Sequence, residues 1–245
     1  MQWLRDMWTK EGPGISKNAP KKTGLALFGQ TFAREWWEMV KLNILFILAA
    51  LLIIPLPAAL AAMAFVCVAF VEDRNTYLLR DFLEALRRYF WRATIWGLLF
   101  AVAIGLGVYA IGTYASAARD NLMMAVPLAI AFVVTVFLSL MACHLLVLMV
   151  MVMRDMPAKT LLQLSAIASI IRPLPVMAAL LFVAGLWLAH IAFYPVSVFM
   201  PATLNFSLGM FAIAFAAHRA AVMVLALPVA TQPNLQTKAA AAKHI

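Results

Sequence analysis

Residues 42–71 read LNILFILAALLIIPLPAALAAMAFVCVAFV and contain no charged side chain. Further long apolar runs follow as far as Ala230, and short clusters of charge separate them at positions 72–92, 119–120 and 154–159. A helix that crosses bilayer hydrocarbon needs about 20 apolar residues, whereas a water-soluble core of ordinary size does not need so many such runs. The sequence therefore predicts an all-α, polytopic membrane protein built as a helix bundle.

The composition limits how much of the chain can lie outside the membrane. Of the 245 residues, 66% are hydrophobic and 12% are charged. This leaves room for about five to seven spans and for no separate soluble domain of typical size. We expect a basic cytoplasmic segment at residues 1–35, a membrane domain at 36–230 and a disordered tail at 231–245. Because about forty mostly polar residues precede the first apolar run, a cleavable signal peptide is not expected.

The distribution of charge predicts the location of the protein. The formal net charge is +9, and the largest local excess lies in the first 41 residues. We interpret this basic flank as a cytoplasmic segment held by the positive-inside bias and by anionic lipid, not as a nucleic-acid site. Cys67 and Cys143 lie inside apolar runs, which predicts no disulfide framework. The expected location is the bacterial inner membrane, with both termini in the cytoplasm.

The first apolar run, 36–71, is interrupted by Pro55 and Pro57. Proline cannot sit in the middle of one straight helix, so we expect two short helices joined by a turn. Each arm has about 15 to 19 residues against the roughly 20 of a full span, so the pair either crosses fully or forms a re-entrant hairpin. Two arms place the basic N-terminus and the cluster at 72–92 on the same side, as the positive-inside rule requires.

The remaining runs, 93–118, 121–153, 173–195 and 203–227, bring the expected number of passes to about six. The run at 93–118 carries a small-residue surface suited to close helix contact, made by Ala101, Gly105, Gly107 and Gly112. The run at 121–153 is longer than a bilayer requires, so it must tilt, kink near Pro127 or project. The two halves of the chain show no convincing repeat, which does not support an inverted-repeat transporter core.

Between the second and third runs, residues 73–92 predict a cytoplasmic amphipathic helix. Leu78, Phe82, Leu86 and Tyr89 recur at helical spacing, with arginines distributed around them. Such a helix is either a docking surface for a partner or anionic headgroups, or a connector in the membrane interface that covers the ends of neighbouring helices. As a docking surface, its partner-binding residues would be Leu78, Phe82, Leu86, Arg87 and Arg88.

From about Gly24 to Gly97 the chain resembles the YesL-like family of bacterial membrane proteins, whose biochemical role is not established. The resemblance rests on LNILFILAALLIIPLP, on the small-residue helix after it, on Asp73-Arg74 with Tyr77, and on FLEALRRYFWRAT at 82–94. Tyr89 departs from the family, which usually has Asn before the aromatic residue equivalent to Phe90. The resemblance implies a small multi-spanning protein often found beside carbohydrate uptake systems, and it supplies no catalytic residues.

The segment at 82–94 also invites comparison with importer permeases, which couple to an ATPase through a cytoplasmic Glu-Ala-Ala signature. Glu84-Ala85 matches the start of that signature, but Phe90 stands about where its glycine would fall. An ATPase-coupled permease is therefore a minor hypothesis.

Three ionisable residues inside the apolar runs are candidates for an internal polar site, because a charge at bilayer depth is costly. Arg219 and its neighbour His218 lie late in the last run, where Arg219 is either buried in the bundle or extends to the cytoplasmic interface. His144 is a candidate for a proton relay or a soft-metal site, or else simply packs in the bundle. Because no second His or Cys pair has ligand spacing, we predict no metal.

Motifs of catalysis are missing from the sequence. It contains no Gly-x-x-x-x-Gly-Lys-Ser/Thr, His-Glu-x-x-His or Gly-x-Ser-x-Gly, and its ten carboxylates lie at span ends or in flanks. We therefore predict a protein that is not an enzyme and has no cofactor, acting as an accessory or component of a transport system. The alternatives are an autonomous carrier or channel for a small solute or anion and, third, a membrane enzyme acting on a lipid-linked substrate. The protein is also a possible homo-oligomer, and the sequence does not decide whether it self-associates.

Overall fold

The computed structural model describes residues 23–52, 56–152 and 156–227, and the regular elements of these residues are helices. The all-α prediction is thus confirmed. The chain divides into two compact units, Met1–Arg34 and Glu35–Ile245. In the first unit, Gly24 has φ of 61° and immediately precedes helix α2. The expected tail at 231–245 and most of the expected basic segment lie outside the described residues.

The first apolar run forms two helices, as predicted, α2 (Leu25–Ala50) and α3 (Leu56–Val71). Pro57 lies in the first turn of α3, where a missing N–H breaks no intrahelical hydrogen bond. Helix α3 is buried around its whole circumference, and Ala58, Ala59 and Ala61 are 0% exposed. A helix that is apolar on every side is buried, and small residues let its neighbours approach closely.

Helix α4 (Leu78–Asp120) corrects the prediction of a separate amphipathic helix. Residues 73–77 are not helical, and the helix that begins at Leu78 continues through position 92 into the next apolar run. The composition changes near Ala93, but no proline or other helix-breaking residue accompanies the change. The 43 residues of α4 extend about 65 Å, roughly twice the hydrocarbon thickness of a bilayer.

Helix α4 pairs with α5 (Ala125–Val152), and the 3₁₀ turn η1 (Leu122–Met124) joins them. At Gly107 the helices are so close that a Cβ would lie 2.2 Å from Thr135 Oγ1. A Cβ at Gly105 or Gly112 would meet no described atom within 4 Å, so the predicted small-residue surface is used at Gly107. Pro127 lies in the first turn of α5, which explains how the helix accommodates it.

Three further helices complete the second unit, α6 (Ala158–Ile171), α7 (Pro173–Ala192) and α8 (Phe206–Leu225). The sequence did not predict α6, which has 14 residues, too few for the roughly 20 of a full span. Leu161, Leu164 and Ala168 form its buried stripe. A π-helical turn, η2 (Pro201–Asn205), leads directly into α8.

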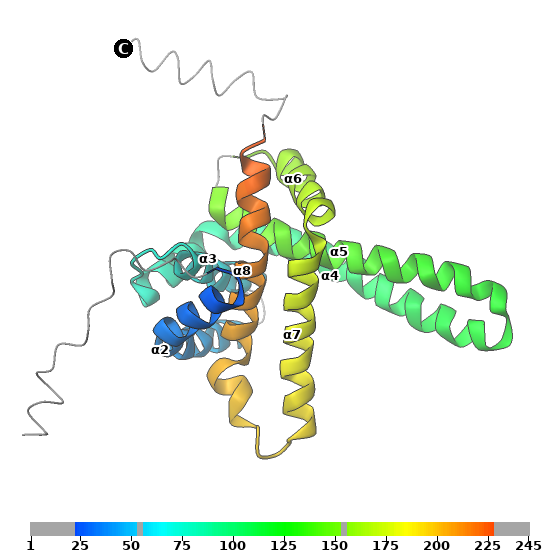
Figure 1. Ribbon diagram of the computed structural model, residues 1–245, viewed down its shortest axis with the longest axis horizontal. Coiled ribbons are helices and arrows are strands. Elements are labelled where there is room, and N and C mark those ends of the chain that lie inside the picture. The colour runs from blue at the N-terminus through cyan, green and yellow to red at the C-terminus, as the bar shows by residue number, and fades with distance from the viewer. Residues whose placement is uncertain (1–22, 53–55, 153–155, 228–245) are drawn as a thin grey trace, which may run out of the picture. The chain divides into compact units, whose positions relative to one another are not determined.

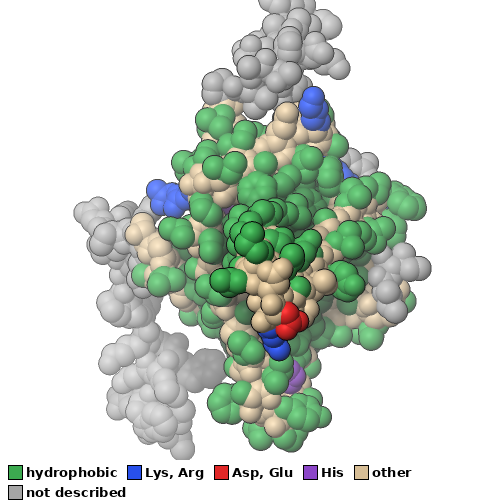
Figure 2. Space-filling view, turned by 90° about the vertical axis from the view of Figure 1, so that its right-hand side faces the viewer, with side chains coloured by type: hydrophobic (Ala, Val, Ile, Leu, Met, Phe, Trp, Pro, Cys, Tyr) green, Lys and Arg blue, Asp and Glu red, His purple; other side chains and the backbone are tan. Residues whose placement is uncertain are grey.

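The six expected passes correspond to α2, α3, α4, α5, α7 and α8. Among the described helices, α4, η1 with α5, α7, and η2 with α8 are each long and apolar enough to cross a bilayer. In the most apolar 18-residue stretches of α4 and α7, only 6% and 11% of the residues are buried, so most of their side chains face outward. Figure 2 shows one such face, covered mostly by hydrophobic side chains. Lipid is the solvent that such a surface requires.

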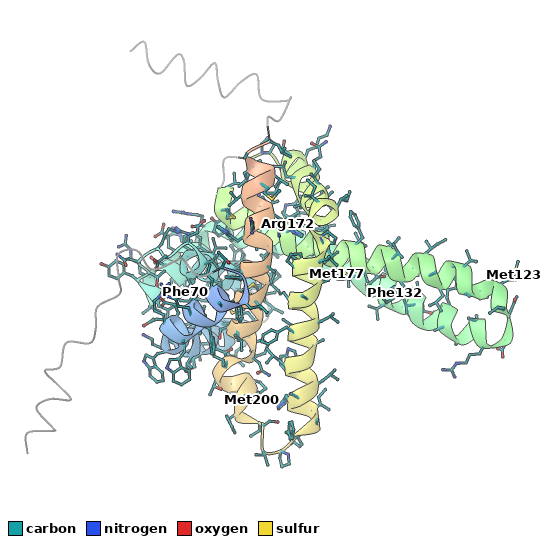
Figure 3. The ribbon with its side chains drawn as sticks, viewed as in Figure 1. Phe70, Met123, Phe132, Arg172, Met177 and Met200 are labelled. Atoms are coloured by element: carbon teal, nitrogen blue, oxygen red, sulfur yellow. The ribbon has the colours of Figure 1, made fainter. Side chains whose placement is uncertain are left out.

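Within the second unit, α3 packs against α4, α5 and α8. Helices α7 and α8 run side by side, and the hairpin of α4 and α5 runs across their direction (Figure 1). Met123 marks the tip of that hairpin in Figure 3. The core therefore lies around α3, while the far part of the hairpin and the outer side of α7 are open to their surroundings.

Candidate functional site

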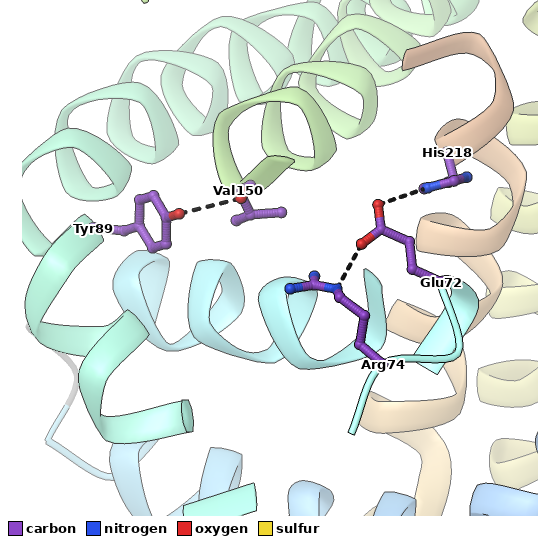
Figure 4. Close-up of polar contacts among 5 residues, drawn as sticks. All are labelled: Glu72, Arg74, Tyr89, Val150 and His218. Carbon is purple, nitrogen blue, oxygen red and sulfur yellow. Dashed lines mark hydrogen bonds and ion pairs between the residues drawn. The ribbon is translucent and has the colours of Figure 1, made fainter. Parts of the chain in front are cut away.

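The predicted partner-binding residues do not share one side of α4. Phe82 is 1% exposed and belongs to a buried stripe with Ala85, Tyr89 and Ala93. The Tyr89 hydroxyl donates a hydrogen bond to the Val150 carbonyl oxygen at 3.2 Å, which attaches α4 to α5 (Figure 4). The docking prediction is therefore wrong for Phe82, because this side chain lies inside the protein. Leu78, Leu86 and Arg88 are half-buried, and Arg87 is exposed.

The opposite side of α4 presents a different row of residues. Leu79 (57% exposed), Leu83 (51%), Arg87 and Trp91 (75%) recur at intervals of four, and we call them the α4 exposed face. Residues four apart lie on one side of a helix. Beside this face, Leu83, Glu84, Arg87 and Arg88 line an open depression of about 600 Å³. The sequence alone could not select this face, since both sides of the helix carry large apolar residues.

Two polar contacts organise the first turns of α4. The Asp81 carboxylate accepts a hydrogen bond from the Tyr77 backbone N–H at 2.9 Å, which supplies the helix start with an acceptor. Arg92 Nη2 donates to the Met156 carbonyl oxygen at 2.7 Å, beyond the end of α5. The segment just after α5 therefore meets the charged first turns of α4 at one end of the unit, as it must if both lie on the same side of a membrane.

At the same end of the unit, a hydrogen bond between side chains joins the end of α3 to α8. Glu72, just after α3, accepts from His218 Nε2 at 3.0 Å and pairs with Arg74 Nε at 2.7 Å (Figure 4). The Arg74 guanidinium lies 5.7 Å from the ring centre of Phe65, a distance suited to a cation–π contact. His218 thus has a carboxylate partner at this end of the unit, which was not predicted from the sequence. The shared side of Glu72 and His218 in the expected topology was a signal that could have suggested it.

The predicted internal polar residues do not form one site. Arg219 is exposed in the described structure, so it is not buried in the bundle. His218 bonds to the end of α3, whereas His144 is 0% exposed and bonds to α6. The three residues therefore have three different environments.

His144 has an unusual hydrogen-bonding pattern. Its Nδ1 lies 2.9 Å from the Leu140 carbonyl oxygen and 3.1 Å from Ser169 Oγ, while the Ser169 hydroxyl donates to the Ser165 carbonyl oxygen at 2.8 Å. Because the Leu140 carbonyl oxygen can only accept and the Ser169 hydroxyl donates elsewhere, we assign the hydrogen to Nδ1, which leaves Nε2 as an acceptor. Nε2 is buried and has no partner among the described residues. An unsatisfied buried acceptor costs about 1–3 kcal/mol, so this atom is suited to accept a hydrogen bond from a donor group.

Asn43 of α2 holds the π-helical turn and was not singled out from the sequence. Its Nδ2 donates to the carbonyl oxygens of Pro201 and Ala202, both at 2.9 Å. Its Oδ1 accepts from the backbone N–H groups of Phe206 at 3.0 Å and Ser207 at 3.1 Å. One buried amide thus satisfies four backbone groups around the turn. The available signal was a polar asparagine inside an otherwise apolar run.

The described residues contain no group of three or more His, Cys, Asp or Glu side chains that could hold a metal ion. Residues 39–111 match the model of a family described as a protein of unknown function, DUF624. YesL-like proteins carry this domain, so the match supports the resemblance at the level of the domain. No curated protein and no solved structure matches the chain. The matched segment includes Asn43, Glu72 and the whole α4 exposed face.

Proposed function

We propose that this protein is a non-enzymatic, multi-pass component of a transport system in the bacterial inner membrane, and that it binds its partner through the α4 exposed face. The position of that face on α4 is the observation that supports the proposal. Carbohydrate uptake is the class of transport that the YesL-like resemblance implies. Both termini lie in the cytoplasm in this proposal, on the side where the segment after α5 meets the charged first turns of α4.

The depth of the α4 exposed face follows from charge. The first turns of α4 carry Arg80, Asp81, Glu84, Arg87, Arg88 and Arg92. Charges at the centre of a bilayer are expensive, and α4 exceeds the length of a span by more than 20 residues. The first turns therefore lie at the membrane surface, within reach of a cytoplasmic partner.

The chemistry of the α4 exposed face suits a protein partner. Tryptophan and arginine are enriched among the residues that dominate binding energy at protein interfaces. Here Trp91 and Arg87 lie on the same row as two exposed leucines, and the depression beside Leu83 and Arg87 offers a concave surface. Anionic headgroups can occupy the remaining basic surface at the same level.

The test is recovery of an importer from native membranes in mild detergent, identified by mass spectrometry. The variant combines Leu83→Ser with Arg87→Glu, which changes the α4 exposed face without altering its buried stripe. The matched control combines Leu122→Ser with Arg119→Glu, because these exposed residues lie at the hairpin tip. Truncation of a dominant interface residue costs about 2 kcal/mol or more, or roughly 30-fold in affinity.

We expect stoichiometric recovery of sugar-importer subunits with the wild type and the control, and their loss with the variant. Recovery of the importer with both variants alike would contradict binding through the α4 exposed face. Recovery of the protein alone from native membranes would contradict an accessory role.

The second candidate function is an autonomous carrier, and buried His144 is the observation that favours it. A carrier needs a polar site inside the bundle, and His144 Nε2 is a buried acceptor with no described partner. This function predicts solute flux into liposomes that contain only this protein, and loss of flux in His144→Phe. Arg219→Ala is a control, because Arg219 is exposed. Absence of flux for a panel of sugars and anions would leave the accessory function.

A further inference from the structure

The loop between α7 and η2, residues 193–200, has the sequence FYPVSVFM. No Asp, Glu, Lys or Arg occurs from position 173 to position 217, so α7, the loop, η2 and the part of α8 before His218 are uncharged. Its apolar side chains point outward: Phe193 (68% exposed), Tyr194 (67%), Val196 (78%), Val198 (59%) and Phe199 (60%). A loop in water ordinarily presents polar side chains, and this one presents the opposite.

The backbone of the loop bonds mainly to itself. The N–H groups of Phe193 and Tyr194 donate to the carbonyl oxygens of Ala189 and Ile191 at the end of α7. Within the loop, Ser197 donates to Phe193 and Val198 donates to Pro195, both at 3.1 Å, and Met200 donates to Ser197 at 2.9 Å. Such internal pairing is what the backbone requires where water is absent.

The polar side chains of this region also turn inward. Ser197 is 4% exposed, and its hydroxyl donates to the His190 carbonyl oxygen at 2.8 Å. His190 Nδ1 lies 3.1 Å from both Ser197 Oγ and the Ser197 carbonyl oxygen. The Trp187 ring packs edge to face against both His190 and Phe206. Ser197 and His190 are therefore paired with each other on the inner side of the loop, while the outer side is apolar apart from the Tyr194 hydroxyl.

We propose that residues 193–200 insert among the phospholipid acyl chains of the leaflet at their end of the bundle. The occupant is identified by continuity with the lipid-facing side of α7, where Leu181, Leu188 and Ile191 are 72%, 66% and 69% exposed. Figure 3 shows Met177 on α7 and Met200 close to the end of the α7–α8 pair. The apolar surface that begins on α7 thus extends over the loop without interruption by charge.

An open cavity beside the loop is large and apolar enough to hold part of one acyl chain. It has a volume of about 470 Å³, and its walls come from the end of α2, the start of α3, the loop and η2. Its lining residues are all apolar: Phe46, Ile47, Ala50, Leu51, Leu56, Val198, Pro201, Ala202 and Phe206. The volume lies within the roughly 300–1,000 Å³ of ordinary ligand sites. The Asn43 bonds to Pro201 and Ala202 fix the wall opposite α2.

The decisive experiment compares two positions of equal exposure in the full chain. Val196 is 78% exposed in the loop and Met123 is 77% exposed at the hairpin tip, next to the charged pair at 119–120. Each is replaced by cysteine in a background with Cys67→Ser and Cys143→Ser. The proteins are placed in phosphatidylcholine nanodiscs, which leave both membrane faces accessible, and are treated with a charged maleimide.

We expect Met123→Cys to react about tenfold faster or more, because hydrocarbon excludes a charged reagent from Val196→Cys. Both must react equally after denaturation in dodecyl sulfate. A spin label at Val196→Cys should collide more with oxygen than with a water-soluble nickel chelate, the pattern of an acyl-chain environment.

Equal labelling of the two cysteines in nanodiscs, or preferential collision with nickel, would place the loop in water and overturn the proposal. Low collision with both reagents would show that protein, such as a second copy of the chain, covers the loop, and would also overturn it.

Discussion

Helix α3 and the α4–α5 hairpin between position 98 and its charged tip are both mainly apolar, yet α3 is buried on all sides while the hairpin faces outward. The two differ in side-chain size. Helix α3 is rich in alanine, whereas the exposed hairpin positions are mostly large, such as Leu98, Leu106 and Ile130. Because lipid is as apolar as leucine, hydrophobicity does not decide which helix becomes central in a membrane. Small side chains favour the central position of α3, since they permit close contact on every side.

The same substitution at two alanines tests this distinction, and at the buried one it should give the largest effect. Ala61→Leu places a larger side chain at a position that is 0% exposed in α3. Overpacking of a tight core costs about 1–3 kcal/mol and occasionally more. Ala101→Leu changes an exposed position of α4 in the same way and should alter stability by no more than about 0.5 kcal/mol. Thermal unfolding in detergent, followed by size-exclusion fluorescence, measures both. Equal losses would contradict the role of side-chain size.

A smaller effect is expected where the hairpin is itself tightly packed. Gly107→Ala places a Cβ 2.2 Å from Thr135 Oγ1 and should destabilise the protein by about 1–2 kcal/mol. Gly105→Ala meets no described atom within 4 Å, and should be neutral or stabilising by up to about 1 kcal/mol through helix propensity. Equilibrium unfolding in mixed micelles distinguishes the two. Adding Thr135→Ala should restore part of the loss in Gly107→Ala, and no rescue would mean that the contact is not its cause.

The smallest effect is expected at the rim of the unit. Glu72→Gln removes a carboxylate that pairs with His218 and Arg74, but the side chain of Glu72 is 29% exposed. Partly exposed ion pairs contribute about 0–1 kcal/mol, so the loss should not exceed about 1 kcal/mol. The loss should shrink at high salt if charge carries the interaction. Unfolding of Glu72→Gln and His218→Ala, alone and combined, forms a double-mutant cycle, and additive losses would show that the pair is not coupled.

The sequence was sufficient to predict the elements whose signal is local. Long apolar runs predicted the membrane helices, and Pro55 with Pro57 predicted the break between α2 and α3. Helix α6 was missed because it has only 14 residues and contains Lys159 and Gln163. The sequence predicted two elements, 73–92 and 93–118, where the structure has the single helix α4, because a change of composition near Ala93 does not end a helix.

The side-chain contacts of the candidate sites depend on distant parts of the chain. Asn43 bonds to backbone groups about 160 positions away, and Glu72 bonds to a histidine 146 positions away. A helical pattern likewise cannot tell which of two apolar faces turns inward. Phe82 and Tyr89 face the core because α3 and α5 lie there, and the Tyr89 hydroxyl finds the Val150 carbonyl oxygen.

The unbroken course of α4 has a mechanical consequence. Because its 43 residues form one continuous helix, a displacement of its first turns can be transmitted along it to the hairpin tip. Helix α4 comes close to α3 at Gly97, where a Cβ would lie 2.6 Å from Pro57 Cβ, and we expect this crossing to act as the pivot. A partner that tilts the first turns of α4 would therefore swing the hairpin tip in the opposite direction.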